Sequence, residues 1–237
     1  RSFHVTGVQT CALPISTAFF AGTIGLVQND IKRVIAYSTC SQLGYMFFAC
    51  GVSAYQAGVF HLFTHAFFKA LLFLAAGSVI IGMHHDQDIR HMGGLRRHMP
   101  VTWITSLLGT LALVGTPFLS GFYSKDSIIE AVAESHLPGA GFAHFAVLAG
   151  VFVTAFYSFR MYFLVFHGKE RYDQNPDAHH DDQGHGHDDH HEPHESPWVV
   201  TVPLLLLAIP SVVIGYMTIE PMLFGEFFKD AILINAD

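Results

Sequence analysis

Charged residues are scarce in this sequence of 237 residues: they make up 13% of the chain, whereas hydrophobic residues make up 51%. Soluble domains carry about 25% charged residues, so this composition and a positive mean hydropathy argue against a soluble core. They predict an integral membrane protein. The net charge of −7, with only 12 Lys and Arg residues, indicates no nucleic-acid partner.

Cysteine is rare as well. The chain has three cysteines, Cys11, Cys40 and Cys50. They show neither a CxxC pair nor another metal-binding spacing. A disulfide framework and an iron–sulfur cluster are therefore not indicated.

Long apolar runs are what the sequence does contain. They predict an all-α fold, a polytopic bundle of transmembrane helices. Basic loops at one side of this bundle place that side in the cytoplasm by the positive-inside rule. The expected spans cover residues 34–52, 55–83, 100–134, 142–166 and 198–218.

The first 16 residues differ from the rest. They lack the charged start, apolar run and cleavage site of a signal peptide. The run from Val5 to Ser16 resembles a translated sequencing adapter, so we expect residues 1–16 to be a non-native leader. Residues 17–27 make only half a span, which predicts that the chain is a fragment of a longer protein.

Three ionisable residues interrupt the apolar segment 55–83, namely His61, His65 and Lys69. At about 100° per residue, His65 lies roughly 40° and Lys69 roughly 80° around the helix from His61, so all three share one face. An ionisable group at this depth is costly, so it is a functional candidate and the three predict a proton relay. Each histidine taken singly also fits a satisfied core residue. The His61/His65 spacing fits two metal ligands, but Lys69 on the same face would repel a cation.

The segment 100–134 is too long for one straight crossing of about 30 Å. Gly115 and Pro117 predict a break in its helix, because proline removes a hydrogen bond and glycine loosens the preceding turn. Lys125 and Asp126 follow this break, as charged residues do beside the discontinuous helices of transporters. The alternative is that both merely mark the end of a span.

Two further stretches are polar. Residues 36–45 are rich in small and hydroxyl side chains, for which we expect helix packing rather than a proton path. Residues 170–197 contain many histidines and acidic residues, and their composition predicts a disordered cytoplasmic loop. No ligand spacing recurs in this loop, so we expect no metal site there. A further span and a truncated tail are expected in residues 198–237.

Several motifs together resemble the subunit L family of NADH-quinone oxidoreductase, respiratory complex I. The resemblance is specific and extends over residues 17–169, which would form an antiporter-like transmembrane domain. The motifs are Asp30–Thr39, Ser41–Tyr45, His61–Leu74, Met92–Leu95 and Gly121–Asp126.

This resemblance implies a function. Members of the family move protons across a bacterial inner membrane, coupled to electron transfer from NADH to quinone in other subunits. It implies that Lys69, His61 and His65 form the central relay, that Lys125 is the terminal lysine on the broken helix, and that Asp126 modulates Lys125. It further implies partners among the other membrane-arm subunits, and no cofactor on this chain.

Other functions remain open. The large subunit of multi-subunit Na⁺/H⁺ antiporters resembles the same region, but usually reads serine-lysine-glutamate where this chain has Ser124, Lys125 and Asp126. Membrane subunits of proton-pumping hydrogenases are a further relative. A zinc transporter would explain the histidine-rich loop but not Lys69, and a membrane scaffold would not explain two intramembrane lysines.

Overall fold

The computed structural model describes residues 7–136, 140–172, 192–229 and 231–232, with only the backbone described for residues 7–12. These residues form helices and no strand beyond a single bridge between Asp30 and Asp88. The all-α expectation is confirmed. The elements are α1 (Gly7–Val27), α2 (Ile31–Gly51), α3 (Tyr55–Gly82), α4 (Pro100–Val114), α5 (Ser120–Ala133), α6 (Ala140–Phe166), α7 (Trp198–Ile219) and the π-helical turn η3 (Glu220–Phe224).

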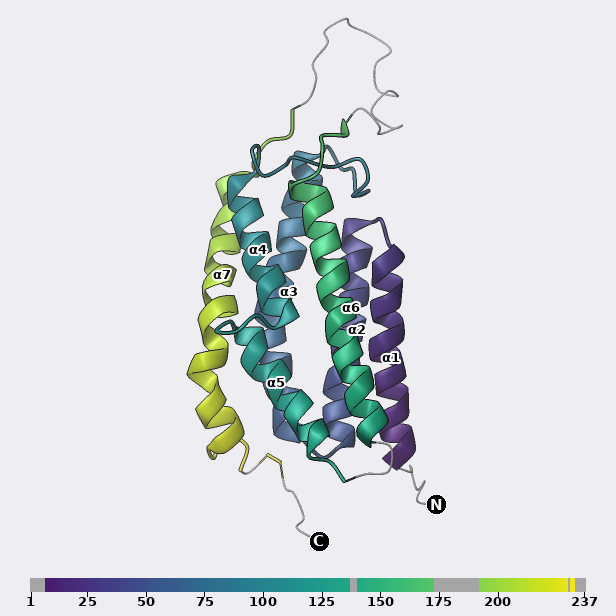
Figure 1. Cartoon of the computed structure of the whole chain (residues 1–237). Helices are drawn as coiled ribbons and strands as arrows, with labels where there is room; N and C mark the ends of the chain where they lie inside the picture. The colour runs from purple at the N-terminus through teal and green to yellow at the C-terminus, as the bar shows by residue number, and fades with distance from the viewer. Residues whose placement is uncertain (1–6, 137–139, 173–191, 230, 233–237) are drawn as a thin grey trace, which may run out of the picture.

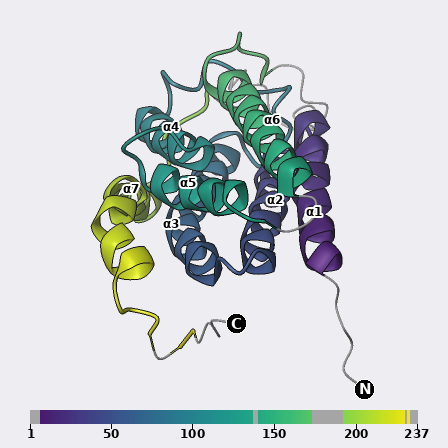
Figure 2. The ribbon, with the colours of Figure 1, turned by 60° about the horizontal axis from the view of Figure 1, so that its bottom comes forward.

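The helices run side by side in an elongated bundle (Figure 1). Helix α3 contacts α2, α4, α5 and α7, so it lies at the centre of the packing. Helix α1 lies against α2 and α6 on one flank, and α7 covers α3, α4 and α5 on the other (Figure 2). Residues on α3 are therefore surrounded by side chains from most of the bundle.

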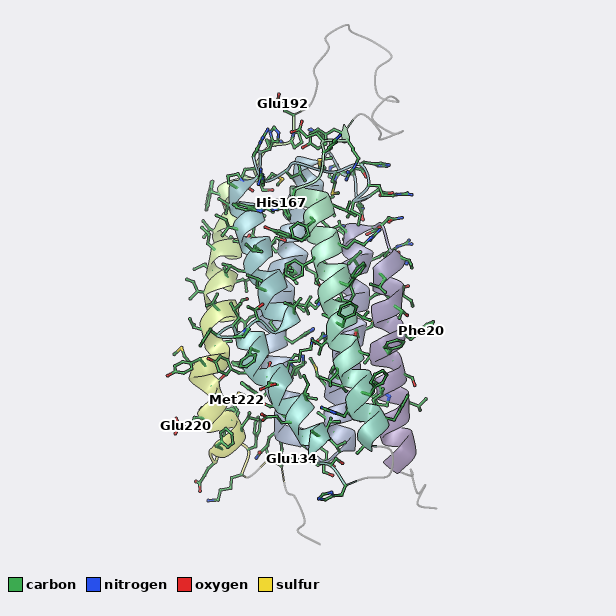
Figure 3. The ribbon with its side chains drawn as sticks, in the orientation of Figure 1. Phe20, Glu134, His167, Glu192, Glu220 and Met222 are labelled. Carbon is green, nitrogen blue, oxygen red and sulfur yellow. The ribbon has the colours of Figure 1, made fainter. Side chains whose placement is uncertain are left out.

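Within the described residues, three helical segments are long and apolar enough to cross a membrane: Tyr55–Gly82, Ala140–Phe166 and Trp198–Phe224. Helix α2 covers most of the expected span 34–52 and has 21 residues, but it is not among the three. Its hydroxyl and amide side chains and its basic first turn lower its hydropathy. Apolar side chains such as Phe20 on α1 point outward from the bundle, as a lipid-facing surface requires (Figure 3).

The expected break in segment 100–134 is confirmed. Helix α4 ends at Val114. The next residue, Gly115, caps the helix with a φ of 83°, the left-handed conformation that glycine adopts without strain. Phe118 also has a positive φ, and α5 begins at Ser120. Gly121 allows α5 to approach α4, because a Cβ atom there would overlap the Ala112 carbonyl oxygen. The chain thus divides the span into two half-helices (Figure 1).

Helix α7 packs directly on this break. The Ser120 hydroxyl donates a hydrogen bond of 2.6 Å to the Ser211 carbonyl oxygen. A Cβ atom on Gly215 would come within 2.5 Å of the Ser120 Cα atom, so only glycine permits this approach. The break is therefore held in place by α7, whose Ser211 lies 91 residues after Ser120 in the sequence.

Helix α1 runs from Gly7 to Val27 and so crosses the expected boundary at residue 16, while the non-native origin of residues 1–16 stays a prediction. Ile15 and Ala18, on either side of the boundary, pack into one apolar cluster. A Cβ atom on Gly44 of α2 would come within 2.7 Å of both the Pro14 carbonyl oxygen and the Ala18 nitrogen. Helix α2 therefore packs against both sides of the boundary at once.

The two edges of the expected loop 170–197 contact the bundle, and disorder of the loop itself stays a prediction. The Tyr172 hydroxyl donates a hydrogen bond to the Gly93 carbonyl oxygen. Glu195 accepts hydrogen bonds from the backbone N–H groups of Val101 (2.8 Å) and Thr102 (3.3 Å), so it caps the start of α4. Residues 173–191, which contain most of the histidines of this loop, lie outside the described residues.

The loop between α3 and α4, residues 83–99, covers the end of the bundle at which α2 and α4 begin. Its backbone joins the start of α2, since the Ile31 N–H bonds the Gln87 carbonyl oxygen at 2.9 Å and the Ile89 N–H bonds the Asn29 carbonyl oxygen at 2.8 Å. Hydrogen bonds from the Arg90 guanidinium hold the pKa of the Asp88 carboxyl below its usual range.

Candidate functional site

The three ionisable residues of α3 share one buried face. His61 is 1% exposed, His65 5% and Lys69 4%. The ring centroids of His61 and His65 are 5.9 Å apart. Because these side chains point into the bundle rather than to lipid, their polar atoms can contact only protein groups or water.

His61 joins three helices. Its Nδ1 atom lies 2.9 Å from the Ser124 hydroxyl on α5, and its Nε2 atom lies 3.0 Å from the Gln42 Oε1 atom on α2. The amide oxygen can only accept, so Nε2 carries the proton of the neutral ring and Nδ1 accepts from Ser124. Thr64 lies 2.7 Å from the same Ser124 hydroxyl. The result is a directed chain of hydrogen bonds across the bundle.

Both ring nitrogens of His61 are therefore occupied. This arrangement disfavours the pair of metal ligands that the His61/His65 spacing allows. Within the described residues, no three His, Cys, Asp or Glu side chains are grouped to hold a metal ion.

Lys69 is bound to α2. Its ammonium donates hydrogen bonds to the Ser38 hydroxyl at 2.6 Å and to the Ile35 carbonyl oxygen at 3.4 Å. The Tyr157 hydroxyl of α6 donates to the same Ser38 oxygen at 2.7 Å. Ser38 thus receives two donors, and no carboxylate pairs with Lys69 among the described residues.

His65 lies between Lys69 and His61 along the helix. Its Nε2 atom is buried and has no hydrogen-bond partner in the described part of the chain. The ring meets Phe68 edge-on, with centroids 5.3 Å apart. The hydrogen-bond chain is therefore interrupted at His65, and a proton passing between Lys69 and His61 needs water or a rotation of this ring.

Lys125 follows Ser124 on α5 and is 2% exposed. Its ammonium has no hydrogen-bond partner among the described residues, and its nitrogen lies 5.4 Å from the centre of the Tyr45 ring. Asp126 is half-buried and forms no ion pair with Lys125. The structure brings His61 and Ser124 together beside Lys125, but it does not bring Asp126 into this group.

The polar partners on α2 lie within residues 36–45, for which only helix packing was predicted. Packing does explain Ser41, whose hydroxyl donates to the Ala18 carbonyl oxygen at 2.7 Å. Ser38 and Gln42, however, contact Lys69 and His61. Their spacing of four residues places them on one helix face, a signal that could have identified a polar stripe opposite α3.

Residues 8–156 match the NADH:quinone oxidoreductase/Mrp antiporter transmembrane family. The chain belongs to this family. The match begins at residue 8, within the expected non-native leader, and includes both α3 and the broken helix.

Curated relatives support the same assignment. The chain is 67% identical to NADH-quinone oxidoreductase subunit L of Neisseria meningitidis serogroup B, over 93% of this chain and 33% of the relative. It is 50% identical to subunit L of Rhodobacter capsulatus, over 91% of this chain and 29% of the relative. The resemblance to subunit L is therefore confirmed, and the chain spans about a third of the length of these relatives.

Two solved structures have the same fold. A chain of the membrane-bound sulfane sulfur reductase, an archaeal respiratory membrane complex, matches with a TM-score of 0.73 and 28% identity, over 88% of this chain and 32% of that one. A chain of the Mrp complex from Dietzia sp. matches with a TM-score of 0.73 and 19% identity, over 92% and 47%. The second likeness shows the fold alone.

Proposed function

We propose that this chain is part of a proton-translocating membrane subunit of NADH-quinone oxidoreductase, in which electron transfer from NADH to quinone occurs on other subunits. The bond between His61 and Ser124, at 2.9 Å, is the observation that supports this most directly. It connects the ionisable face of α3 with the half-helix that carries Lys125. A relay needs such a connection between its central and terminal groups.

The proton steps follow from the hydrogen-bond directions. A neutral His61 donates from Nε2 to Gln42, so its Nδ1 atom, which accepts from Ser124, can take a proton once the Ser124 hydroxyl turns away. Once protonated, the ring donates from Nδ1 to the Ser124 oxygen, and the Ser124 hydroxyl releases its own proton to the Lys125 amine through water, because no hydrogen-bond partner reaches the Lys125 nitrogen among the described residues. His61 returns to its neutral form, and Lys125 holds one proton more than before.

Lys69 would supply the proton. When Lys69 is charged, its ammonium is held by the Ser38 hydroxyl and the Ile35 carbonyl, neither of which carries a charge. A positive charge arriving next to it from a neighbouring part of the complex would expel a proton by repulsion, because charges interact strongly in a dry interior. His65 stands on the path to His61.

The surroundings of the chain are part of the same proposal. The bundle would cross a bacterial inner membrane several times, with lipid against its outer side chains. Its partners would be the other membrane-arm subunits of the complex, and its translocated ion the proton. No redox cofactor is assigned to this chain.

The test uses the complete subunit in the assembled complex, in inverted membrane vesicles that oxidise NADH. Lys125→Ala and Lys69→Met should each lower proton uptake per NADH oxidised, since each removes one group that carries the proton. Lys229→Ala, at an exposed lysine in an ion pair with Glu226, is the matched control and should pump normally. Unchanged stoichiometry in both relay variants would exclude this path.

A stand-alone Na⁺/H⁺ antiporter is the second candidate, favoured by the family, which includes the Mrp antiporters. The same vesicles distinguish the two. If NADH has no effect and an imposed sodium gradient drives protons only when Lys125 is present, the antiporter function replaces the respiratory one.

A further inference from the structure

Lys125 has an unusual environment for a buried ammonium. It is 2% exposed, and no hydrogen-bond acceptor reaches its nitrogen within the described residues. The nitrogen lies over the Tyr45 ring of α2, 5.4 Å from the ring centre. A cation within about 6 Å of an aromatic ring centre is attracted by the negative face of the ring.

The position of this ring is fixed from α6. Tyr45 is 1% exposed, and its hydroxyl donates a hydrogen bond of 2.9 Å to the Val147 carbonyl oxygen. Gly150, one turn further on, leaves space for that hydroxyl, since a Cβ atom there would overlap the Tyr45 oxygen and would lie 3.2 Å from Cζ. The absence of a side chain at position 150 is therefore matched to a tyrosine at position 45.

We propose that Tyr45 is a positioning residue for the terminal lysine: its ring, fixed by the Val147 carbonyl and the gap at Gly150, holds the charged form of Lys125 at the break. This inference rests on the proposed relay function of Lys125. It adds a group on α2, and a supporting pair on α6, to a site that the sequence places on α3 and α5 alone.

The attraction acts only on the protonated lysine. When Lys125 releases its proton, the neutral amine loses the interaction with the ring, so the ring favours holding the proton over releasing it. Other titratable groups face Lys125 from α3, namely His61 and Lys69, and Asp126 follows it on α5. Among the described residues, Tyr45 is the partner on α2.

The experiment measures proton translocation by the assembled complex in inverted vesicles as a function of pH. Tyr45→Leu removes the ring, so less Lys125 stays protonated and the alkaline limb of the profile should move to lower pH by about 0.5 to 1.5 units. Tyr45→Phe keeps the ring but removes its hydrogen bond to the Val147 carbonyl oxygen, so the limb should move less than in Tyr45→Leu. Tyr55→Leu, at an exposed tyrosine at the start of α3, is the matched control.

A second pair of variants tests the same geometry without removing the ring. Gly150→Ala should displace the Tyr45 hydroxyl, and with it the ring, from its position beside Lys125, and so should move the alkaline limb. Adding Tyr45→Phe to Gly150→Ala removes the overlapping oxygen, and the limb should return to the position that it has in Tyr45→Phe alone. If Tyr45→Leu prevents assembly, this rescue decides the matter. A defect in assembly alone would lower translocation at every pH and would not move the alkaline limb and then bring it back.

Lys125→Met in parallel separates the two levels of the proposal. If Lys125→Met leaves translocation unchanged, the relay function itself fails. If Lys125→Met reduces translocation while Tyr45→Leu and Gly150→Ala keep the original limb, the relay stands and the role of Tyr45 is overturned. A limb that shifts with the ring and returns with the double variant supports both.

Discussion

His61 and Ser124 are joined by a hydrogen bond of 2.9 Å, although 63 residues separate them in the sequence. The bond links the central helix α3 to the second half of the broken helix. The Ser124 hydroxyl also lies 2.7 Å from the Thr64 hydroxyl, so it is oriented from two sides. The break between α4 and α5 is what brings the start of α5, and Ser124 with it, to the level of His61.

Ser124→Ala should slow proton translocation without preventing assembly. The substitution removes the only side-chain group of α5 that hydrogen-bonds the His61 ring in the described residues. Proton uptake per NADH oxidised is the measurement. Ser127→Ala is the matched control on the same helix, since the Ser127 hydroxyl bonds only the Tyr123 carbonyl oxygen among the described residues. Equal rates in the two variants would contradict a path through Ser124.

Ser38→Ala should impair the complex more than Tyr157→Phe does. The first substitution deprives the Lys69 ammonium of its shortest hydrogen bond, at 2.6 Å, in a buried site without a carboxylate. A charged donor left without this acceptor costs roughly 1.5–3 kcal/mol. The second substitution removes a neutral donor to Ser38 and leaves the lysine bond intact.

The measurement is the pH dependence of proton translocation in the same vesicles. Loss of the Ser38 hydroxyl should favour the neutral lysine, so translocation should fall at a lower pH than in the unsubstituted subunit. A greater effect of Tyr157→Phe would show that Tyr157, rather than Lys69, is the important partner of Ser38.

The parts of the site that could be predicted from the sequence are those with a local signal. Lys69 stands out because a charged side chain in an apolar run is costly wherever the helix packs. The break was predictable because Pro117 restricts the backbone, and Gly115 frees it, at their own positions. Both signals are independent of which helices become neighbours.

The polar partners lacked such a signal. Ser38, Gln42 and Ser124 are small or neutral side chains that serve helix packing and hydrogen bonding equally well, and only the neighbouring helix decides between the two roles. Ser41, three residues from Ser38, does serve packing.

Gly121→Ala should destabilise the bundle at the break. The added methyl group would overlap the Ala112 carbonyl oxygen, which is backbone and cannot rotate away. Overpacking of this kind costs at least about 1–3 kcal/mol. Thermal unfolding of the purified complex in detergent would show it as a lower midpoint. Gly77→Ala on α3, where a Cβ atom meets nothing within 4 Å, should leave the midpoint unchanged or raise it slightly. A similar midpoint for both variants would contradict the close approach.

Glu195→Ala should destabilise the start of α4. The carboxylate accepts from the N–H groups of Val101 and Thr102 and from the Thr102 hydroxyl at 2.5 Å, and a lost helix cap costs about 0.5–2 kcal/mol. Thermal unfolding of the purified complex is again the measurement, and Glu192→Ala is the control, at an exposed carboxylate outside this cap.

The cap also changes what a loop deletion should do. We expect removal of residues 173–191 to leave NADH-driven proton uptake near normal, provided that the chain resumes at Glu192 and Glu195 still reaches α4. Extending the deletion through Glu195 should lower the unfolding midpoint, because the N–H groups of α4 then lose their acceptor in a segment that water reaches poorly. If the shorter deletion alone abolished uptake, the histidine-rich residues would have a function of their own, and the longer deletion could no longer be explained by the cap.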